Sequence, residues 1–385
     1  MNTKILHLSH TDISNDSRIL KSMKAAEDRG YKVFGIGVRL NEGNSASSYF
    51  DEEKIVSLEL FFKKLSFLPK VIRYSLIYLE LFLRSLLLTI RKKPDILHCN
   101  DFITLPVGII IKIFFKTALV YDAHELESNR NGLNRLFAIV VLNMERMLWP
   151  FIDGLIVVSP SIQKWYHKNV GIKMSTVVLN SPAYNNHSIS PNIDTDDYFR
   201  LKYAIADDIK IFLYIGVFCE GRGIELILET FKSERVKSHV VFLGHGELLD
   251  DINSASLTCE KIHIHDPIPH EQVTLLAKSA DIGLCLIENI SLSYYLSLPN
   301  KLFEYSFSGL PVLASDFPDI ASFVNKYKVG KVTQLDSHSI IESVLLFEND
   351  MLNYTFSIDS LSPVSWPSQE LILLNFYKQI LLRKG

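Results

Sequence analysis

The sequence predicts an α/β fold built from two parallel-sheet domains of the Rossmann type. Residues 5–38 read as strand, loop, helix, glycine and strand, which is how a βαβ unit begins. The same alternation starts again near residue 210, after a polar stretch without periodicity. A chain of 385 residues is long enough for two such domains, each with its own core.

The composition indicates which classes of protein the chain can belong to. The chain is 48% hydrophobic and 22% charged, which is typical of a folded globular protein. Its net charge of −3 gives no overall attraction to nucleic acid. The N-terminus is too short and polar for a signal peptide, and no apolar run is long enough to span a bilayer. Four scattered cysteines indicate reduced thiols in a cytoplasmic protein: Cys99, Cys219, Cys259 and Cys285.

The first half opens with a strand, a helix and a strand, at residues 5–8, 17–29 and 31–38. Asp16 or Ser17 can cap the helix, and Gly30 ends it. Arg18 lies in the first turn, where a cation opposes the helix dipole. It is therefore expected either to face an anionic ligand or to be solvated. The first loop lacks G-x-G-x-x-G, which disfavours a nicotinamide oxidoreductase.

A basic and apolar segment runs from Phe61 to Lys93 and contains one acid, Glu80. Its eight basic residues are Lys63, Lys64, Lys70, Arg73, Arg84, Arg91, Lys92 and Lys93. Residues 71–90 predict a helix that is either buried against a sheet or placed at a membrane interface. We expect most of it to be buried, with the basic ends and three phenylalanines touching an anionic membrane. These are Phe61, Phe62 and Phe67.

Polar residues follow the strand expected at residues 117–121, in the motif D-A-H-E. Open α/β sheets bind ligands at the carboxyl ends of their strands. His124 can hydrogen-bond a sugar hydroxyl or a phosphate, and the alternative is a loop histidine held by its neighbours. Asp122 and Glu125 either serve the same site or only orient the loop or a nearby arginine. The other elements expected here are strands at 95–99, 154–158 and 176–179 and helices at 104–115, 135–149 and 161–168.

The second half begins after the polar stretch 183–197, so the domains are expected at 1–183 and 184–362. A strand at 210–215 leads to Gly216, and Arg222 stands at a glycine-lined helix start, which suits a diphosphate. Gly244 and Gly246 follow the next strand and would let a nucleotide approach the backbone. Tyr294 and Tyr295 either cover a ligand or pack on the domain.

Residues 296–318 contain the most informative stretch. Asn300 stands where a helix cap belongs, residues 301–308 predict a helix, and Gly309 ends it. Free N–H groups at the helix start, together with Lys301, would attract an anion, and Glu304 lies one turn further on. The alternative is an ordinary helix–strand joint with a surface lysine and glutamate.

The motif L-P-N-K-L-F-E-Y followed by G-L-P-V resembles the donor-binding segment of family-4 glycosyltransferases, as do D-S-R and D-A-H-E elsewhere in the chain. The resemblance implies the GT-B fold, with two Rossmann-like domains facing a cleft and a C-terminal helix, within 363–385, crossing back to the first domain. Leu371, Leu374, Tyr377 and Leu381 would form its apolar face. A second glutamate of the family pattern is replaced here by Leu296.

The resemblance also implies roles for individual residues. Glu304 would bind the ribose hydroxyls, and Asn300 and Lys301 at the helix start would face the diphosphate. His124 would reach the donor sugar, and the loop containing Pro267 would hold the base. The expected catalytic residues are His124, Arg222, Lys301 and Glu304. The expected donor-binding residues are Gly216, Arg222, Gly244, Gly246, Pro267, Asn300, Lys301 and Glu304, and those on the acceptor side are Asp16, Ser17, Arg18 and Asp122.

The expected function is transfer of a sugar, with retention, from a UDP- or GDP-linked donor to a glycan or lipid-linked acceptor in bacterial surface polysaccharide synthesis. No metal and no cofactor are expected, and the sequence has no suitably placed D-x-D. Two alternatives remain open: a nucleotide-sugar epimerase of the same fold, and a degenerate glycosyltransferase that acts as a scaffold.

Overall fold

The computed structural model describes residues 3–39, 50, 53–182, 197–349, 354 and 356–383, without the side chains of residues 270 and 271. Most of the stretch expected to join the domains, 183–197, lies outside the described residues. The chain forms two compact units. Unit 1 comprises Met1–Val178 and Glu370–Gly385, and unit 2 comprises Leu179–Gln369.

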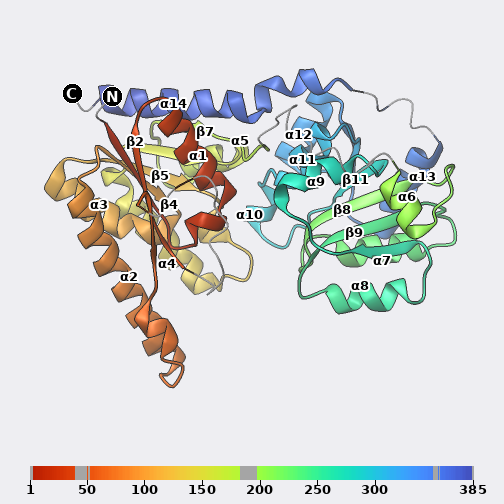
Figure 1. Cartoon of the computed structure of the whole chain (residues 1–385), viewed down its shortest axis with the longest axis horizontal. Helices are drawn as coiled ribbons and strands as arrows, with labels where there is room; N and C mark the ends of the chain where they lie inside the picture. The colour runs from red at the N-terminus through yellow and green to blue at the C-terminus, as the bar shows by residue number, and fades with distance from the viewer. Residues whose placement is uncertain are drawn as a thin grey trace. The chain divides into compact units, whose positions relative to one another are not determined.

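Unit 1 is built on a sheet of seven described strands in the order β3-β2-β1-β4-β5-β6-β7. All its neighbouring strands are parallel. The strands are β1 Lys4–Leu8, β2 Lys32–Val38, β3 Ile55–Leu58, β4 Ile96–Asn100, β5 Ala118–Ala123, β6 Gly154–Val157 and β7 Ser175–Val177. Parallel neighbours require crossover connections, and helices supply most of them here (Figure 1).

The helices of unit 1 are α1 Ser17–Asp28, α2 Lys70–Lys92, α3 Leu105–Phe115, α4 Arg135–Leu148 and α5 Pro160–Asn169. Short 3-10 turns complete it: η1 Ile13–Asn15, η2 Phe61–Lys64, η3 Phe102–Thr104, η4 Glu127–Asn129 and η5 Trp149–Phe151. The crossover helices return antiparallel to the strands, so they begin at the carboxyl edge of the sheet. That edge also carries the polar residues that follow β1, β4 and β5.

The C-terminal helix α14, Trp366–Leu382, belongs to unit 1 from Glu370 onward, so the predicted crossing is confirmed. Phe376 and Ile380 pack so closely on Gly154 of β6 that a Cβ there would lie 2.7 Å from each side chain. The predicted contact face was wrong at Leu371, which is 49% exposed. Of the predicted face, Leu374 and Tyr377 are buried, and the other buried apolar residues of the helix are Trp366, Leu373, Phe376 and Ile380.

Unit 2 contains a parallel sheet of six described strands in the order β10-β9-β8-β11-β12-β13. They are β8 Ile211–Val217, β9 His239–His245, β10 Ile262–His265, β11 Ile282–Cys285, β12 Val312–Ser315 and β13 Gly330–Thr333. Successive residues of β8 enter different cores: Leu213 belongs to one apolar cluster and Tyr214 to the other. Both faces of the sheet are therefore covered.

Helices surround this second sheet (Figure 1). They are α6 Tyr198–Tyr203, α7 Ile224–Lys232, α8 Leu249–Ser256, α9 His270–Ala277, α10 Leu292–Tyr295, α11 Asn300–Phe307, α12 Pro318–Tyr327 and α13 Ser337–Asn349, followed by η7 Ile358–Val364. The strands and helices predicted from the sequence are confirmed, mostly with bounds shifted by one or two residues. No prediction covered β3, α6, α8, α12, β13 or α13, and α10 lies in a stretch that was expected to be a loop.

The prediction that the helix within residues 71–90 is mostly buried is wrong. Of α2, only Leu81, Ser85 and Thr89 are buried. Its 23 residues span about 35 Å, whereas five-residue β4 spans about 17 Å, so half of the helix has no sheet to pack on. Figure 1 shows the N-terminal half of α2 projecting beyond the rest of unit 1. Of the helices that the structure describes, none combines the length and apolar character needed to cross a bilayer.

Candidate functional site

Arg18 of α1 is buried and paired within unit 1. Its Nε and Nη2 donate to the two carboxylate oxygens of Asp122 at 3.3 and 2.9 Å, and its Nη1 donates to the carbonyl of Val178 at 2.8 Å. The expectation of a solvated arginine is therefore wrong, and the anion that Arg18 faces is Asp122. Asp16 caps α1 by accepting from the backbone N–H groups of Arg18 and Ile19. Ser17 is the first residue of the helix.

Asp122, at the end of β5, joins three basic side chains. Besides Arg18, it lies 3.1 Å from Nε2 of His98 and 3.5 Å from Nε2 of His124. Burial alone would raise the pKa of Asp122, but Arg18 and His124 lower it more, to well below its usual value. His98 Nδ1 in turn lies 2.6 Å from the hydroxyl of Tyr377. The network therefore fixes α14 to the sheet.

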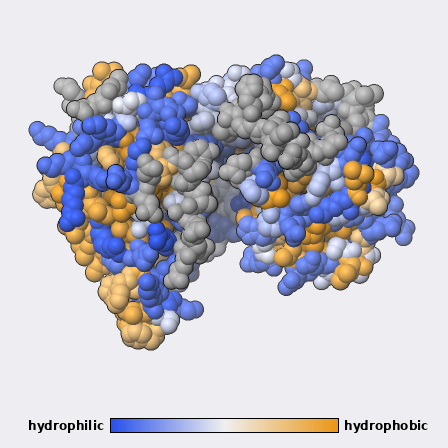
Figure 2. Space-filling view, in the orientation of Figure 1, coloured by the Kyte–Doolittle hydropathy of each residue, from blue (hydrophilic) through white to orange (hydrophobic). Residues whose placement is uncertain are grey.

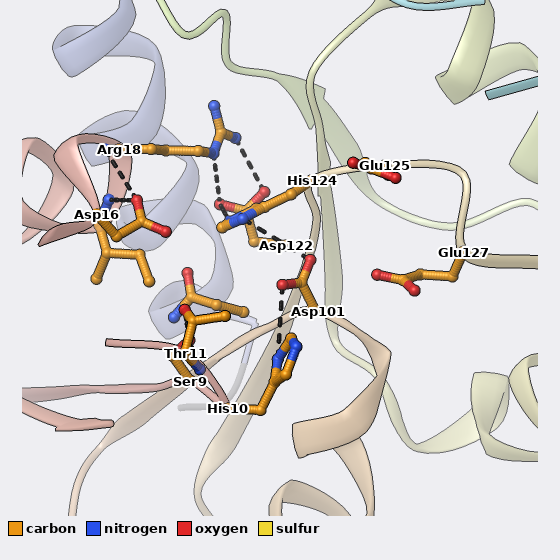
Figure 3. A network of polar contacts seen from close by, with 12 residues as sticks. Ser9, His10, Thr11, Asp16, Arg18, Asp101, Asp122, His124, Glu125 and Glu127 are labelled. Atoms are coloured by element: carbon orange, nitrogen blue, oxygen red, sulfur yellow. Dashed lines mark hydrogen bonds and ion pairs between the residues drawn. The ribbon is translucent and has the colours of Figure 1, made fainter. Parts of the chain in front are cut away.

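His124 lies between two carboxylates, as Figure 3 shows. Its Nδ1 is 3.7 Å from Asp101, on the side of the ring opposite Asp122. Burial lowers the pKa of His124, but Asp101 and Asp122 raise it more, to about 9. Its side chain is 18% exposed, so a protonated imidazole is presented at the carboxyl edge of the sheet.

Asp101 was missed by sequence reasoning. It also lies 3.8 Å from Nδ1 of His10, which follows β1 (Figure 3). Its backbone has φ 65°, a strained conformation for a residue other than glycine. The signal that could have identified it is the aspartate directly after a buried strand, in P-D-I-L-H-C-N-D.

Glu127 was missed as well. It is buried in η4, and its Oε2 lies 3.3 Å from Arg130, which also pairs with the half-exposed Glu125 at 3.2 Å. Burial and the charge of Asp101 raise the pKa of Glu127 to about 8. Its other oxygen, Oε1, has no hydrogen-bond partner among the described residues. Glu127 can thus exchange a proton near neutral pH.

In unit 2, α11 begins at Asn300, and Pro299 occupies the cap position. The prediction that Asn300 caps this helix is wrong, because the extended backbone conformation is taken by Pro299 and Asn300 is already helical. No side chain caps α11. The first N–H groups of the helix are therefore open to an anion, as are those of many anion-binding helix starts.

The amine of Lys301 is buried at this helix start. Lys301 is 7% exposed, and its Nζ lies 3.6 Å from the centre of the Tyr214 ring. A Cβ on Gly216 would lie 3.7 Å from the same amine, an ordinary contact distance, so the backbone of Gly216 passes close to this amine. Nζ has no hydrogen-bond partner among the described residues. Burial lowers the pKa of Lys301 to about 7.

Arg222 and Glu304 complete the charged groups of this region. The guanidinium of Arg222 lies 4.5 Å from the centre of the Tyr294 ring, just before α7. Both Arg222 and Glu304 act electrostatically on the Lys301 amine, Arg222 lowering its pKa and Glu304 raising it. Glu304 is buried on α11, so the alternative of a surface lysine and glutamate at an ordinary joint is wrong. Tyr295 was expected either to cover a ligand or to pack on the domain. It packs on Phe317, with ring centres 5.0 Å apart.

The remaining residues predicted to bind the donor are Gly244, Gly246 and Pro267, which lie outside the group of charged residues around Lys301. A Cβ on Gly244 would lie 2.0 Å from the carbonyl of Gly216, and one on Gly246 would lie 2.3 Å from that of Phe218. Close packing of the chain itself therefore requires both glycines. Pro267 lies in an exposed loop after β10. Within the described part of the chain, no group of three or more His, Cys, Asp or Glu residues could hold a metal.

The chain resembles known proteins in both halves. Residues 23–182 match the model of Glycosyltransferase Family 4, and residues 209–349 match Glycosyl transferases group 1. A chitobiosyldiphosphodolichol beta-mannosyltransferase of Candida albicans is 23% identical over 262 residues, which are 61% of this chain and 56% of that enzyme. The alignment thus spans little more than half of the relative.

Solved structures share the fold at low identity. Sucrose-phosphate synthase from Thermosynechococcus elongatus has a TM-score of 0.78 at 14% identity, over 99% of this chain and 100% of that one. HepE from Anabaena, in complex with UDP-glucose, has a TM-score of 0.73 at 13% identity, over 98% and 100%. Both agree with two Rossmann-like units of the GT-B type. With glycosyltransferase models matching both halves in succession, the chain belongs to the family-4 glycosyltransferases and is a glycosyltransferase enzyme.

Proposed function

We propose that this enzyme transfers a sugar from a UDP- or GDP-linked donor and that unit 2 binds the diphosphate of the donor. One observation carries the proposal: within the described part of the chain, the buried amine of Lys301 has no hydrogen-bond partner and lies at the start of α11, which no side chain caps. A buried cation without a partner is costly to the fold, and a diphosphate would compensate its charge. The solved complex of HepE with UDP-glucose supports a nucleotide sugar as the ligand.

The chemistry requires cations and dipoles where the leaving diphosphate gains charge. In the proposal, Lys301, Arg222 and the N–H groups at Asn300 supply them, and the backbone of Gly216 passes close to the Lys301 amine. Glu304 binds the ribose hydroxyls, as the family resemblance implies. The segment containing Pro267 and the turns at Gly244 and Gly246 lie along the nucleoside.

In unit 1, we assign His124 to a hydroxyl or phosphate oxygen of the donor. Its protonated ring can donate a hydrogen bond, and Asp101 and Asp122 hold it in that state. Asp16, Ser17, Arg18 and Asp122 were predicted on the acceptor side. We now propose that Arg18 and Asp122 act there by positioning His124, because their own polar groups are paired.

Retention, metal independence and a role in bacterial surface polysaccharide synthesis complete the proposal and rest on the family resemblance. A glycan or lipid-linked saccharide is the proposed acceptor, since a matched relative is named for a diphosphodolichol-linked substrate. Free cysteines, two of them buried, support a cytoplasmic location. No observation specifically favours the epimerase or the scaffold.

The test uses Arg222→Ala and Glu304→Ala, assayed with a panel of UDP- and GDP-sugars with and without glycan or lipid-linked acceptors. Each variant is expected to lose roughly 10²–10³-fold in transfer or donor hydrolysis while keeping its melting temperature. Arg235→Ala and Glu229→Ala remove exposed charges of the same type from unit 2 and serve as controls. Wild-type turnover in both site variants would end the assignment. An epimeric nucleotide sugar formed from donor alone would indicate the epimerase, and a wild type that neither binds nor hydrolyses any donor would indicate the scaffold.

A further inference from the structure

Unit 1 carries a long apolar surface that its own fold leaves uncovered. We call residues 61–92, from η2 through the end of α2, the arm. Its large exposed apolar residues are Phe61, Phe67, Val71, Ile72, Tyr74, Tyr78, Leu79, Leu83 and Leu87. Phe67 and Val71, at its projecting end, are 78% and 79% exposed. In Figure 2 this end, at the lower left, is predominantly apolar. Apolar patches of this extent in a folded protein mark an interaction site.

Hydrogen bonds and an ion pair hold η2 against α2. Glu80 accepts hydrogen bonds from the backbone N–H groups of Phe61 and Phe62 at 2.9 and 3.1 Å and pairs with Arg84 at 3.0 Å. Burial raises the pKa of Glu80, but these hydrogen bonds and Arg84 lower it more, so it is ionised at neutral pH. The one acid of the segment therefore fastens η2 to α2.

The charge that remains facing outward is positive. Eight basic residues lie between Phe61 and Lys93, and the single acid is occupied within the arm. At about 100° per residue, Arg73, Arg84 and Arg91 share one stripe of the helix, next to the apolar stripe of Ile72, Leu79 and Leu83. An apolar stripe flanked by cations is the pattern of helices that lie in the interface of an anionic membrane.

A second helix contributes apolar residues at the same edge of the sheet. α4, like α2, begins at the carboxyl edge, because both run antiparallel to the strands. Leu136 and Phe137 in its first turn are 72% and 65% exposed. His124 and Asp101 lie at this edge too, after β5 and β4.

We propose that the arm, together with the start of α4, is a docking surface for an anionic lipid bilayer. The apolar residues enter the interface, and the lysines and arginines contact phosphate headgroups. This surface is independent of the proposed reaction, because it needs neither donor nor acceptor, and its failure would leave the donor site of unit 2 untouched.

The experiment is co-sedimentation of the whole protein with phosphatidylcholine vesicles that contain or lack phosphatidylglycerol, at low and high salt. Binding is expected only with phosphatidylglycerol and weakens in high salt. The combined variant Phe67→Ser, Val71→Ser and Tyr74→Ser is expected to lose at least about ten-fold in partitioning. Its matched control, Leu201→Ser with Leu257→Ser, removes apolar residues of unit 2 that are 81% and 88% exposed and retains binding.

A charge variant separates the electrostatic part. Lys70→Gln with Arg91→Gln is expected to weaken partitioning roughly five-fold for each charge removed. Absence of binding to anionic vesicles at low salt, equal binding to both lipid mixtures, or full binding by the serine variant would each overturn the proposal. So would light scattering that shows the arm forming a dimer, broken by the serine variant, without any vesicle binding.

Discussion

In unit 1, Arg18 and Asp122 are both buried and neutralise each other at 2.9 Å, whereas in unit 2 Lys301 is also buried and its amine has no hydrogen-bond partner among the residues that the structure describes. Paired charges such as those of unit 1 cannot be exchanged for a ligand without breaking the pair. The amine of unit 2 instead rests on the face of Tyr214, which stabilises a cation without occupying its hydrogen bonds. The charges of Arg18 and Asp122 therefore maintain the fold, and the charge of Lys301 is available to an anion.

The largest effect expected from this comparison is on the stability of unit 1. Asp122→Ala leaves Arg18 and His124 as buried cations without their shared carboxylate, so it should lower the free energy of unfolding by about 3–5 kcal/mol. Denaturant unfolding followed by circular dichroism measures the loss. Arg39→Ala breaks the exposed pair with Glu59 and should change stability by no more than about 1 kcal/mol. Equal losses in the two variants would contradict a structural role for the buried pair.

The sequence predicted the alternation of strands and helices because buried parallel strands and glycine punctuation are local signals. It also predicted that Lys301 and Glu304 share one helix, four residues of sequence being enough to place both. An arginine partner for Asp122 was one of the alternatives, but its identity as Arg18 could not be predicted, since the two residues are 104 positions apart and only the order of the sheet brings them together. Asp101 was missed for the same reason.

The exposure of α2 also lay beyond sequence reasoning. A helix that is apolar nearly all round is usually covered by its domain, and the pattern of residues does not state how far the neighbouring sheet extends. The lengths of α2 and β4 decide the matter. A similar limit applies to Gly244 and Gly246, where the sequence suggested room for a nucleotide and the structure shows neighbouring backbone instead.

The next largest effect is expected from removing the charge of Lys301 in unit 2. Lys301→Met replaces the amine with a side chain of similar length, so UDP-glucose affinity should fall by at least about ten-fold, the cost of one charge-assisted contact. Stability should not fall, because no ion pair is broken and a buried amine that has no hydrogen-bond partner among the described residues is replaced by an apolar side chain. Calorimetric titration with UDP-glucose measures the affinity, and denaturant unfolding measures the stability. A loss of stability as large as that of Asp122→Ala would show that Lys301 is structural and would remove the contrast between the units.

The smallest expected effect is on the pH dependence of stability. His124 of unit 1 and Lys301 of unit 2 should change stability in opposite directions as pH rises. The pKa of His124 is raised to about 9, so its contribution to stability is complete below its usual value of 6.5 and is lost as pH rises through about 9. The pKa of Lys301 is lowered from 10.5 to about 7, so the unfolded chain binds more protons between these values. The penalty for burying Lys301 is therefore greatest below about pH 7 and is relieved as pH rises.

Donor binding should follow Lys301. A diphosphate favours the protonated amine, so UDP-glucose, whose own phosphates do not titrate near neutrality, should bind more tightly at about pH 6.5 than at about pH 8.5 and should take up a proton at the higher pH. Titrations in two buffers of different ionisation enthalpy measure that uptake. Lys301→Met should remove it, while His124, with a pKa of about 9, is mostly protonated over this range in both proteins. Proton uptake that persists in the variant would place the titrating group elsewhere and leave Lys301 without a part in binding the diphosphate.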